Sequence, residues 1–162
     1  MKVCTRKSTR HKPDQPLMAW DGKCGFCHYW VIKWKFITGD RVVYKPFQDV
    51  HKDFPDIDLK EMRKAIHFID TDGRVYAGAA AVFHAMHKYG RKWRWIMPLY
   101  NRFWPFRVTS DLFYSFVSRN RNWIYRITVR LFGKNPARPK AYWAAYLGGF
   151  LGVLILVFVL SG

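Results

Sequence analysis

A Cys-x-x-Cys pair stands between a strand pattern and a helix pattern, and this junction constrains the fold more than any other feature of the chain. Residues 14–20 predict a short strand that ends at an Asp-Gly turn. Residues 24–38 predict a helix, because aromatic and aliphatic side chains recur on one helical face. A second strand is predicted at 41–45. Two strands joined by a helix are expected to lie parallel in a right-handed β-α-β unit.

The segments that follow extend this unit. The patterns predict a loop with one short helix at 48–64, a buried strand at 65–70, its hairpin partner at 74–77, a helix at 78–89 and an amphipathic helix at about 111–131. The order β-α-β, short helix, β-β-α is that of a thioredoxin-like α/β domain. We therefore predict such a domain, with a helical C-terminal extension, over residues 15–133.

The chain is strongly basic, which favours a polyanionic partner. Its 162 residues include 28 Lys and Arg against 11 Asp and Glu, a net charge of +17. Residues 1–14 are predicted to be a disordered basic arm. Residues 91–107 combine aromatic and basic side chains, a composition that also binds single-stranded nucleic acid. We expect some of these aromatic side chains to pack on the core and the others to lie among lipid headgroups.

Lipid is favoured over nucleic acid because of a long apolar run near the C-terminus. Residues 141–160 carry no charge, and a spanning helix needs about 20 residues. A buried core helix is the alternative. The preceding segment, 134–140, holds Lys134, Arg138 and Lys140, so the positive-inside rule predicts that the domain lies on the cytoplasmic side of a single-pass C-terminal anchor.

The two cysteines of the motif differ in their expected chemistry. A cysteine at a helix N-terminus meets unpaired N–H groups and the positive end of the helix dipole, which favour its thiolate. Cys24 is therefore the predicted nucleophile, and Cys27, one turn later, is the predicted resolving thiol.

Several alternatives for this motif remain open on sequence alone. Cys-Gly-Phe-Cys-His also fits haem c attachment, zinc would need further ligands such as Cys4 and His11, and both thiols could be inert core residues. Asp21 either shuttles protons to the buried thiol or only forms the turn. We predict no cofactor and no metal.

The residues also resemble the DCC family of predicted thiol-disulfide oxidoreductases, named for an Asp-x-x-Cys-x-x-Cys motif that here is Asp21, Cys24 and Cys27. Similarity extends to residues 66–76 and 79–82, and to 113–121, and in all covers about residues 16–133. The resemblance implies a thioredoxin-like fold and dithiol redox activity. Unlike ordinary thioredoxins, the chain has no proline in 61–65, where a cis-proline would face the dithiol.

Together these observations predict a membrane-anchored thiol-disulfide oxidoreductase. Its expected partners are a protein or small-molecule thiol or disulfide substrate, anionic membrane lipid and a membrane protein. The alternative is a non-catalytic membrane adaptor whose Cys-x-x-Cys is structural or binds metal. The sequence names neither the substrate nor the direction of electron flow.

Overall fold

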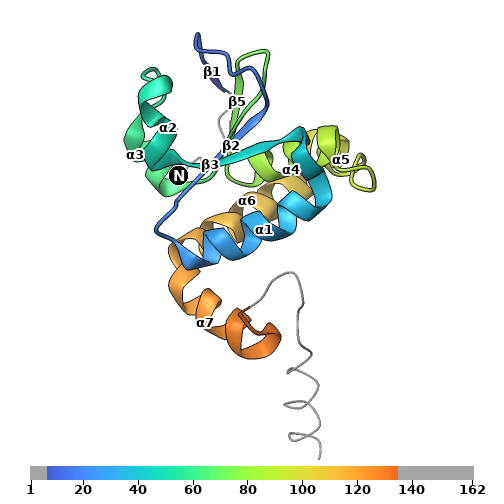
Figure 1. Cartoon of the computed structure of the whole chain (residues 1–162). Helices are drawn as coiled ribbons and strands as arrows, with labels where there is room; N and C mark the ends of the chain where they lie inside the picture. The colour runs from blue at the N-terminus through green and yellow to red at the C-terminus, as the bar shows by residue number, and fades with distance from the viewer. Residues whose placement is uncertain (1–6, 135–162) are drawn as a thin grey trace, which may run out of the picture.

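The computed structural model describes residues 7–134, which form a five-stranded sheet with helices on both faces (Figure 1). The strands are β1 (Lys7–Ser8), β2 (Leu17–Trp20), β3 (Val43–Pro46), β4 (His67–Ile69) and β5 (Arg74–Ala77). Their spatial order is β1-β5-β4-β2-β3. Strands β2 and β3 are parallel, as predicted for strands joined by a helix, and the other pairs are antiparallel.

The helices are α1 (Gly25–Thr38), α2 (Phe47–Val50), α3 (Leu59–Lys64), α4 (Ala79–Tyr89), α5 (Ile96–Arg102), α6 (Trp104–Arg119) and α7 (Arg121–Phe132). Two short 3₁₀ turns, Gly39–Arg41 and His51–Asp53, follow α1 and α2. The mixed α/β order from β2 to α4 confirms the prediction and is consistent with a thioredoxin-like fold.

Side chains alternate between the two faces of the sheet along each strand, so the sheet has a core on each face. Met18 pairs with Phe68, and Phe68 pairs with Tyr76, so these three buried side chains form a row on the face covered by α1, α4 and α5. Leu17 and Ile69 point to the other face, where the α2–α3 segment packs. Each such side chain contributes about 1.5–3 kcal/mol when it is fully buried. The two faces together fix the register of the sheet.

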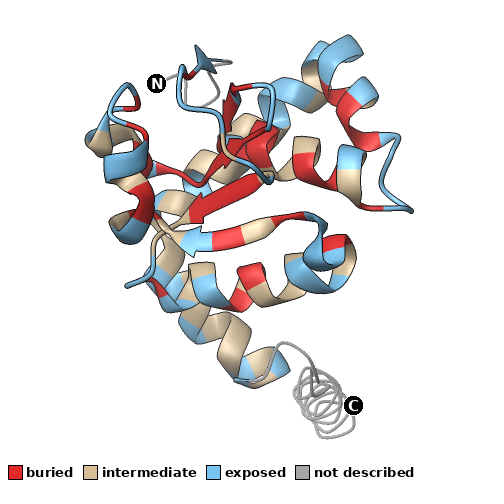
Figure 2. Ribbon diagram, turned by 45° about the horizontal axis from the view of Figure 1, so that its top comes forward, coloured by how far each residue is buried: buried red, intermediate tan, exposed pale blue. Residues whose placement is uncertain are grey.

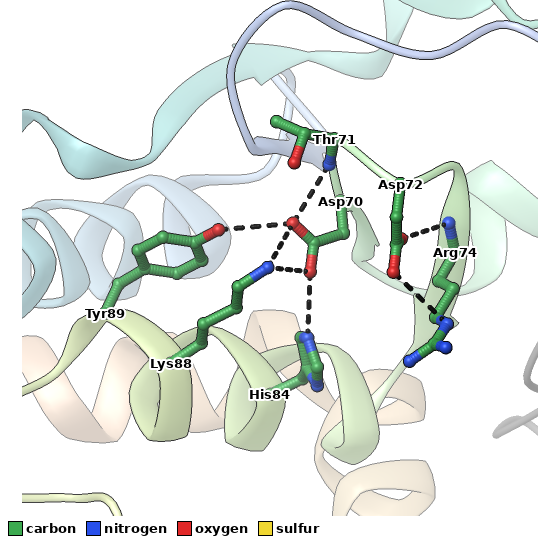
Figure 3. A network of polar contacts seen from close by, with 7 residues as sticks. All are labelled: Asp70, Thr71, Asp72, Arg74, His84, Lys88 and Tyr89. Carbon is green, nitrogen blue, oxygen red and sulfur yellow. Dashed lines mark hydrogen bonds and ion pairs between the residues drawn. The ribbon is translucent and has the colours of Figure 1, made fainter.

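One buried carboxylate ties the β4–β5 turn to α4 (Figure 3). Asp70 is 1% exposed and accepts hydrogen bonds from Lys88 Nζ at 2.7 and 2.9 Å and from Thr71 N at 2.9 Å. His84 Nε2 and Tyr89 OH each lie 3.2 Å from its oxygens. Burial alone would raise the pKa of Asp70, but the hydrogen bonds from Lys88, His84 and Thr71 and the charge of Lys88 together outweigh it and lower the pKa. The carboxylate is therefore charged in the folded protein at neutral pH.

The N-terminal segment differs from the disordered arm predicted for residues 1–14. From residue 7 onward it is described, and β1 pairs with β5 at the edge of the sheet. The next residue, Thr9, is buried; its N–H donates to Gly73 O at 2.8 Å and its hydroxyl donates to Asp56 at 2.7 Å. Gly73 has φ +85°, and a Cβ there would lie 2.7 Å from Thr9 O. Glycine at position 73 therefore allows both this backbone conformation and the close approach of Thr9.

The helix predicted at about 111–131 is wrong in its extent, because two helices meet at Asn120. Asn120 Nδ2 donates to Phe116 O at 2.8 Å, and its backbone N–H also reaches Phe116 O. This side-chain bond competes with the regular helical ladder, as Asn side chains often do. The break allows α7 to turn toward α1.

Part of the basic-aromatic stretch 91–107 packs on the core, as predicted, whereas the predicted contact of the rest with lipid stays a prediction. It forms α5 and the start of α6, with Pro105 in the first turn of α6, where a missing N–H is tolerated. Ile96, Met97 and Tyr100 are buried. The exposed aromatic residues are Trp93, Trp95, Phe103 and Trp104.

Within residues 7–134, none of the helices has both the length and the apolar character needed to cross a membrane. The predicted anchor, 141–160, lies outside the described residues and stays a prediction.

Candidate active site

A disulfide between Cys24 and Cys27 occupies the junction of β2 and α1. After β2 ends at Trp20, the chain turns through Asp21, whose carbonyl accepts the N–H of Cys24 at 3.0 Å. Cys24 is the N-cap of α1, and its sulfur accepts the backbone N–H of Cys27 at 3.1 Å. The two Cα atoms are 5.2 Å apart. The predicted position of the first cysteine at a helix N-terminus is confirmed.

The two sulfurs are not equally accessible. Cys24 is 6% exposed, whereas Cys27 is partly exposed and lines a pocket of about 50 Å³. Cys24 is therefore largely shielded from solvent although it stands at the start of a helix. Helix α7 covers this end of α1: a Cβ at Gly25 would lie 3.0 Å from the ring of Tyr125.

The pocket beside Cys27 is built from three parts of the chain. Aromatic side chains of α1, including Trp30 and Trp34, form one wall. The segment leading from α3 into β4, residues 62–66, and the inner side of α6 complete it. Its lining surface is mainly apolar, although four charged residues also line it, namely Asp21, Arg63, Lys64 and Arg121. Such a site can hold an apolar group next to a sulfur atom.

Asp21 joins the dithiol loop to the C-terminal helices. Its Oδ1 accepts Lys23 N at 3.2 Å and Gln48 Nε2 at 2.9 Å, which is the geometry of an Asp turn. Its Oδ2 lies 3.2 Å from Arg121 Nη1, the first residue of α7. Asp21 also lines the pocket together with Cys27. The structure thus brings together the three site residues named from the sequence.

Two side chains of α6 form hydrogen bonds with backbone groups across the pocket from Cys27. Tyr114 OH accepts the N–H of Ile66 at 3.0 Å, and Ser118 Oγ donates to Lys64 O at 2.8 Å. This is the segment in which the sequence has no proline, and the described residues contain no cis peptide bond. A substrate therefore cannot pair with these two backbone groups while α6 is docked.

Sequence reasoning missed the residues that α6 and α7 supply to the site, namely Tyr114, Ser118, Arg121 and Tyr125. Their amphipathic pattern indicated helices but not where these helices dock. The available signal was the resemblance of residues 113–121 to a segment of the DCC family, which contains the first three of them.

Residues 7–134 contain no group of three or more His, Cys, Asp or Glu side chains arranged to hold a metal ion. Cys4, named above as a potential zinc ligand, lies outside the described residues. His11 is exposed and is described.

A mixed α/β domain with a disulfide at the N-terminus of its first long helix defines a class, the dithiol proteins of thioredoxin-like architecture. The match to a family model narrows the class. The model for DCC1-like thiol-disulfide oxidoreductases matches residues 18–127, so the chain belongs to this family. No curated protein and no solved structure matches the chain.

Proposed function

We propose that this chain is a membrane-anchored oxidoreductase that exchanges its Cys24–Cys27 dithiol with a substrate disulfide. The observation that carries the proposal is the disulfide at the N-terminus of α1, with Cys27 facing a mainly apolar pocket. Membership of the DCC1-like family supports the same chemistry.

In the reduced protein, Cys24 is the proposed nucleophile. The Cys27 N–H and the positive end of α1 favour its thiolate. The Cys24 thiolate attacks one sulfur of the substrate disulfide, a mixed disulfide forms, and the other substrate sulfur leaves as a thiolate. Cys27 then attacks Cys24 Sγ, which re-forms the protein disulfide and releases the second substrate thiol. Two electrons pass to the substrate, and the reverse sequence oxidises a dithiol.

Accessibility favours a second assignment, in which Cys27 carries the mixed disulfide. An incoming thiolate reaches the partly exposed Cys27 more readily than the buried Cys24. Attack at Cys27 expels Cys24, and a sulfur whose thiolate is stabilised is the better leaving group. Cys24 would then resolve the mixed disulfide by attacking Cys27.

Paired trapping variants decide between the two assignments. Cys24→Ser and Cys27→Ser, each in a Cys4→Ser background, are incubated with glutathione disulfide and analysed by intact-protein mass spectrometry. If Cys24 is the nucleophile, the Cys27→Ser variant gains one glutathione much faster. Faster capture by the Cys24→Ser variant assigns the mixed disulfide to Cys27. Negligible capture by both, together with no reversible two-electron couple in a redox titration, would refute the oxidoreductase proposal.

The non-catalytic adaptor is the competing function, and the same titration separates it. Stoichiometric zinc that resists mild oxidation would favour the adaptor, whereas a reversible couple favours the enzyme. The family match and the disulfide support the enzyme.

We propose further that Asp21 accepts the proton of the Cys27 thiol when this thiol attacks, because Asp21 lines the same pocket as Cys27. Asp21→Asn keeps an acceptor for Lys23 N but removes the charge. If the carboxylate accepts a proton, thiol-disulfide exchange by the variant is slower near neutral pH. The rate recovers as pH rises, because the thiolate then forms without help. A uniform change at every pH would indicate that Asp21 only forms the turn.

The anchor at 141–160 is also a proposal, supported by its uncharged sequence and the cations at 134–140. A reporter that is active only outside the cytoplasm, fused after Gly162, is expected to be active. Activity only from a cytoplasmic reporter would reverse the orientation and place the dithiol on the other side of the membrane.

A further inference from the structure

Helix α6 presents two chemically different faces. Its inner face contacts the site through Tyr114 and Ser118, and Val117 lines the pocket beside Cys27. Its outer face is defined here as five exposed apolar side chains at helical spacing. They are Trp104 (67% exposed), Val108 (40%), Leu112 (65%), Phe113 (69%) and Phe116 (54%).

This outer face is about as large as the largest apolar patch that a typical monomeric protein exposes. With aromatic side chains of about 150–250 Å² each, its exposed surface is roughly 600 Å², the upper end of what a typical monomer exposes. Neither α6 nor α7 contains a buried residue, and Figure 2 shows α7, the last coloured helix, in tan and pale blue throughout. Packing within residues 7–134 therefore leaves this face uncovered.

The charges around the outer face favour an anionic surface as its partner. Residues 91–134 contain Asp111 as their single acid, and Asp111 accepts a hydrogen bond from Tyr100 at 2.7 Å. The same stretch contains ten cations: Arg91, Lys92, Arg94, Arg102, Arg107, Arg119, Arg121, Arg126, Arg130 and Lys134. Arg107 and Arg119 are exposed on α6 itself, and Arg119 follows Phe116 by three residues on the same side.

If residues 141–160 span a bilayer, the short chain that precedes them limits how far the end of α7 lies from it. Helix α7 ends at Phe132, and seven residues, 134–140, separate Gly133 from the predicted span at 141. A fully extended chain of seven residues reaches about 25 Å. If residue 141 enters the bilayer, the end of α7 lies within that distance of the headgroups.

From these observations we infer that the outer face of α6 lies in the headgroup layer of an anionic lipid bilayer, with its aromatic rings inserted and its arginines on phosphates. This contact goes beyond the anchor, since it involves the folded domain. Because the inner face of the same helix contributes to the dithiol pocket, the contact holds the pocket about one helix diameter, about 10 Å, from the membrane surface. The reacting thiol of the substrate would then meet the protein next to the bilayer.

Site-directed spin labelling of the full chain tests this placement. Leu112→Cys and the matched control Asp53→Cys are made in a Cys4→Ser background, while the Cys24–Cys27 disulfide protects the active-site sulfurs from the label. Residue 53 is exposed and lies in the segment on the opposite face of the sheet. Both proteins are reconstituted into vesicles of phosphatidylglycerol and phosphatidylcholine, and folding is checked by circular dichroism.

The label at residue 112 is expected to collide mainly with oxygen, which dissolves in lipid, and the label at 53 mainly with a water-soluble nickel complex. In pure phosphatidylcholine vesicles, the label at 112 should be less protected from the nickel complex than in anionic vesicles. Arg107→Glu with Arg119→Glu should also reduce this protection in anionic vesicles, whereas Lys52→Glu should not.

Two results would overturn the inference. One is equal nickel accessibility at 112 and 53 in anionic vesicles. The other is protection at 112 from both reagents, accompanied by a measurable distance between labels on two molecules, which would identify a second copy of the chain as the partner. Neither result depends on whether the dithiol is active, because the labelled protein stays oxidised throughout.

Discussion

Replacement of Asp70 by Asn should destabilise the domain far more than the same change two residues later. Asp70 is 1% exposed and accepts hydrogen bonds from Lys88 and Thr71, with His84 and Tyr89 also within 3.2 Å. Removing one partner of a buried ion pair costs about 3–5 kcal/mol. The Lys88 side chain is 44% exposed and can return to water, so we expect the lower end of this range, about 3 kcal/mol.

The matched control is Asp72→Asn, in the same turn (Figure 3). Asp72 pairs with Arg74 at 3.2 Å, but both side chains are about half exposed, so its loss should cost less than about 1 kcal/mol. For a domain of this size, 1 kcal/mol corresponds to about 4 °C in the midpoint of thermal unfolding. We therefore expect a decrease of about 12 °C for Asp70→Asn and less than about 4 °C for Asp72→Asn.

Circular dichroism of the full chain in mild detergent measures both midpoints. The difference between wild type and Asp70→Asn should also depend on pH. Because the folded pKa of Asp70 is lowered, the stabilisation by its carboxylate is complete above its unfolded pKa of about 3.9 and is lost as pH falls through the folded value. Equal shifts for the two variants, or a difference that does not narrow in acid, would refute the account of the buried ion pair.

Three further predictions concern the site and the core. In the reduced protein, the pH dependence of iodoacetamide labelling should give Cys24 a thiol pKa below about 8.5. A pKa at Cys27 lower than that at Cys24 would contradict the role of Cys24 as the cap of α1. Tyr125→Ala should uncover the start of α1 and speed reduction of the disulfide by dithiothreitol roughly threefold or more, whereas an unchanged rate would mean that α7 does not limit access. Burial lowers the pKa of His67, so the folded state resists its protonation and the free energy of unfolding should fall as pH decreases below about 6.5. Urea unfolding measures this free energy at each pH, and His67→Gln should make it depend less on pH in that range.

The element order from β2 to α4 followed from local signals. Alternation, helical periodicity and the Asp-Gly turn after residue 20 are all properties of neighbouring residues, and each agreed with the fold. The cap at Cys24 could be predicted for the same reason, because a helix that directly follows a strand must begin near the turn between them.

The parts that were missed depend on contacts between distant residues. Strand β1 has two residues and is held by the contacts of Thr9 with Gly73 and Asp56, which no local pattern reveals. The docking of α6 and α7 combines core packing by Phe106 and Tyr114 with single hydrogen bonds and one ion pair, and the polar contacts join residues about 50 to 100 positions apart. The pocket beside Cys27 and the approach of Tyr125 to Gly25 also arise from that docking, so the surroundings of the two cysteines could not be read from the motif.

Helices α6 and α7, which pack beside the dithiol, are also the last described part of the domain to be synthesised. Tyr114 and Tyr125 follow Cys27 by 87 and 98 residues along the chain. At a translation rate of about 5–20 residues per second, the Cys-x-x-Cys leaves the ribosome roughly 5–20 s before these residues exist to dock on it. During that interval a thiol reagent in the surrounding medium meets Cys24 without the later barrier. The first encounter of the dithiol with an oxidant or a thiol therefore precedes the docking of α6 and α7.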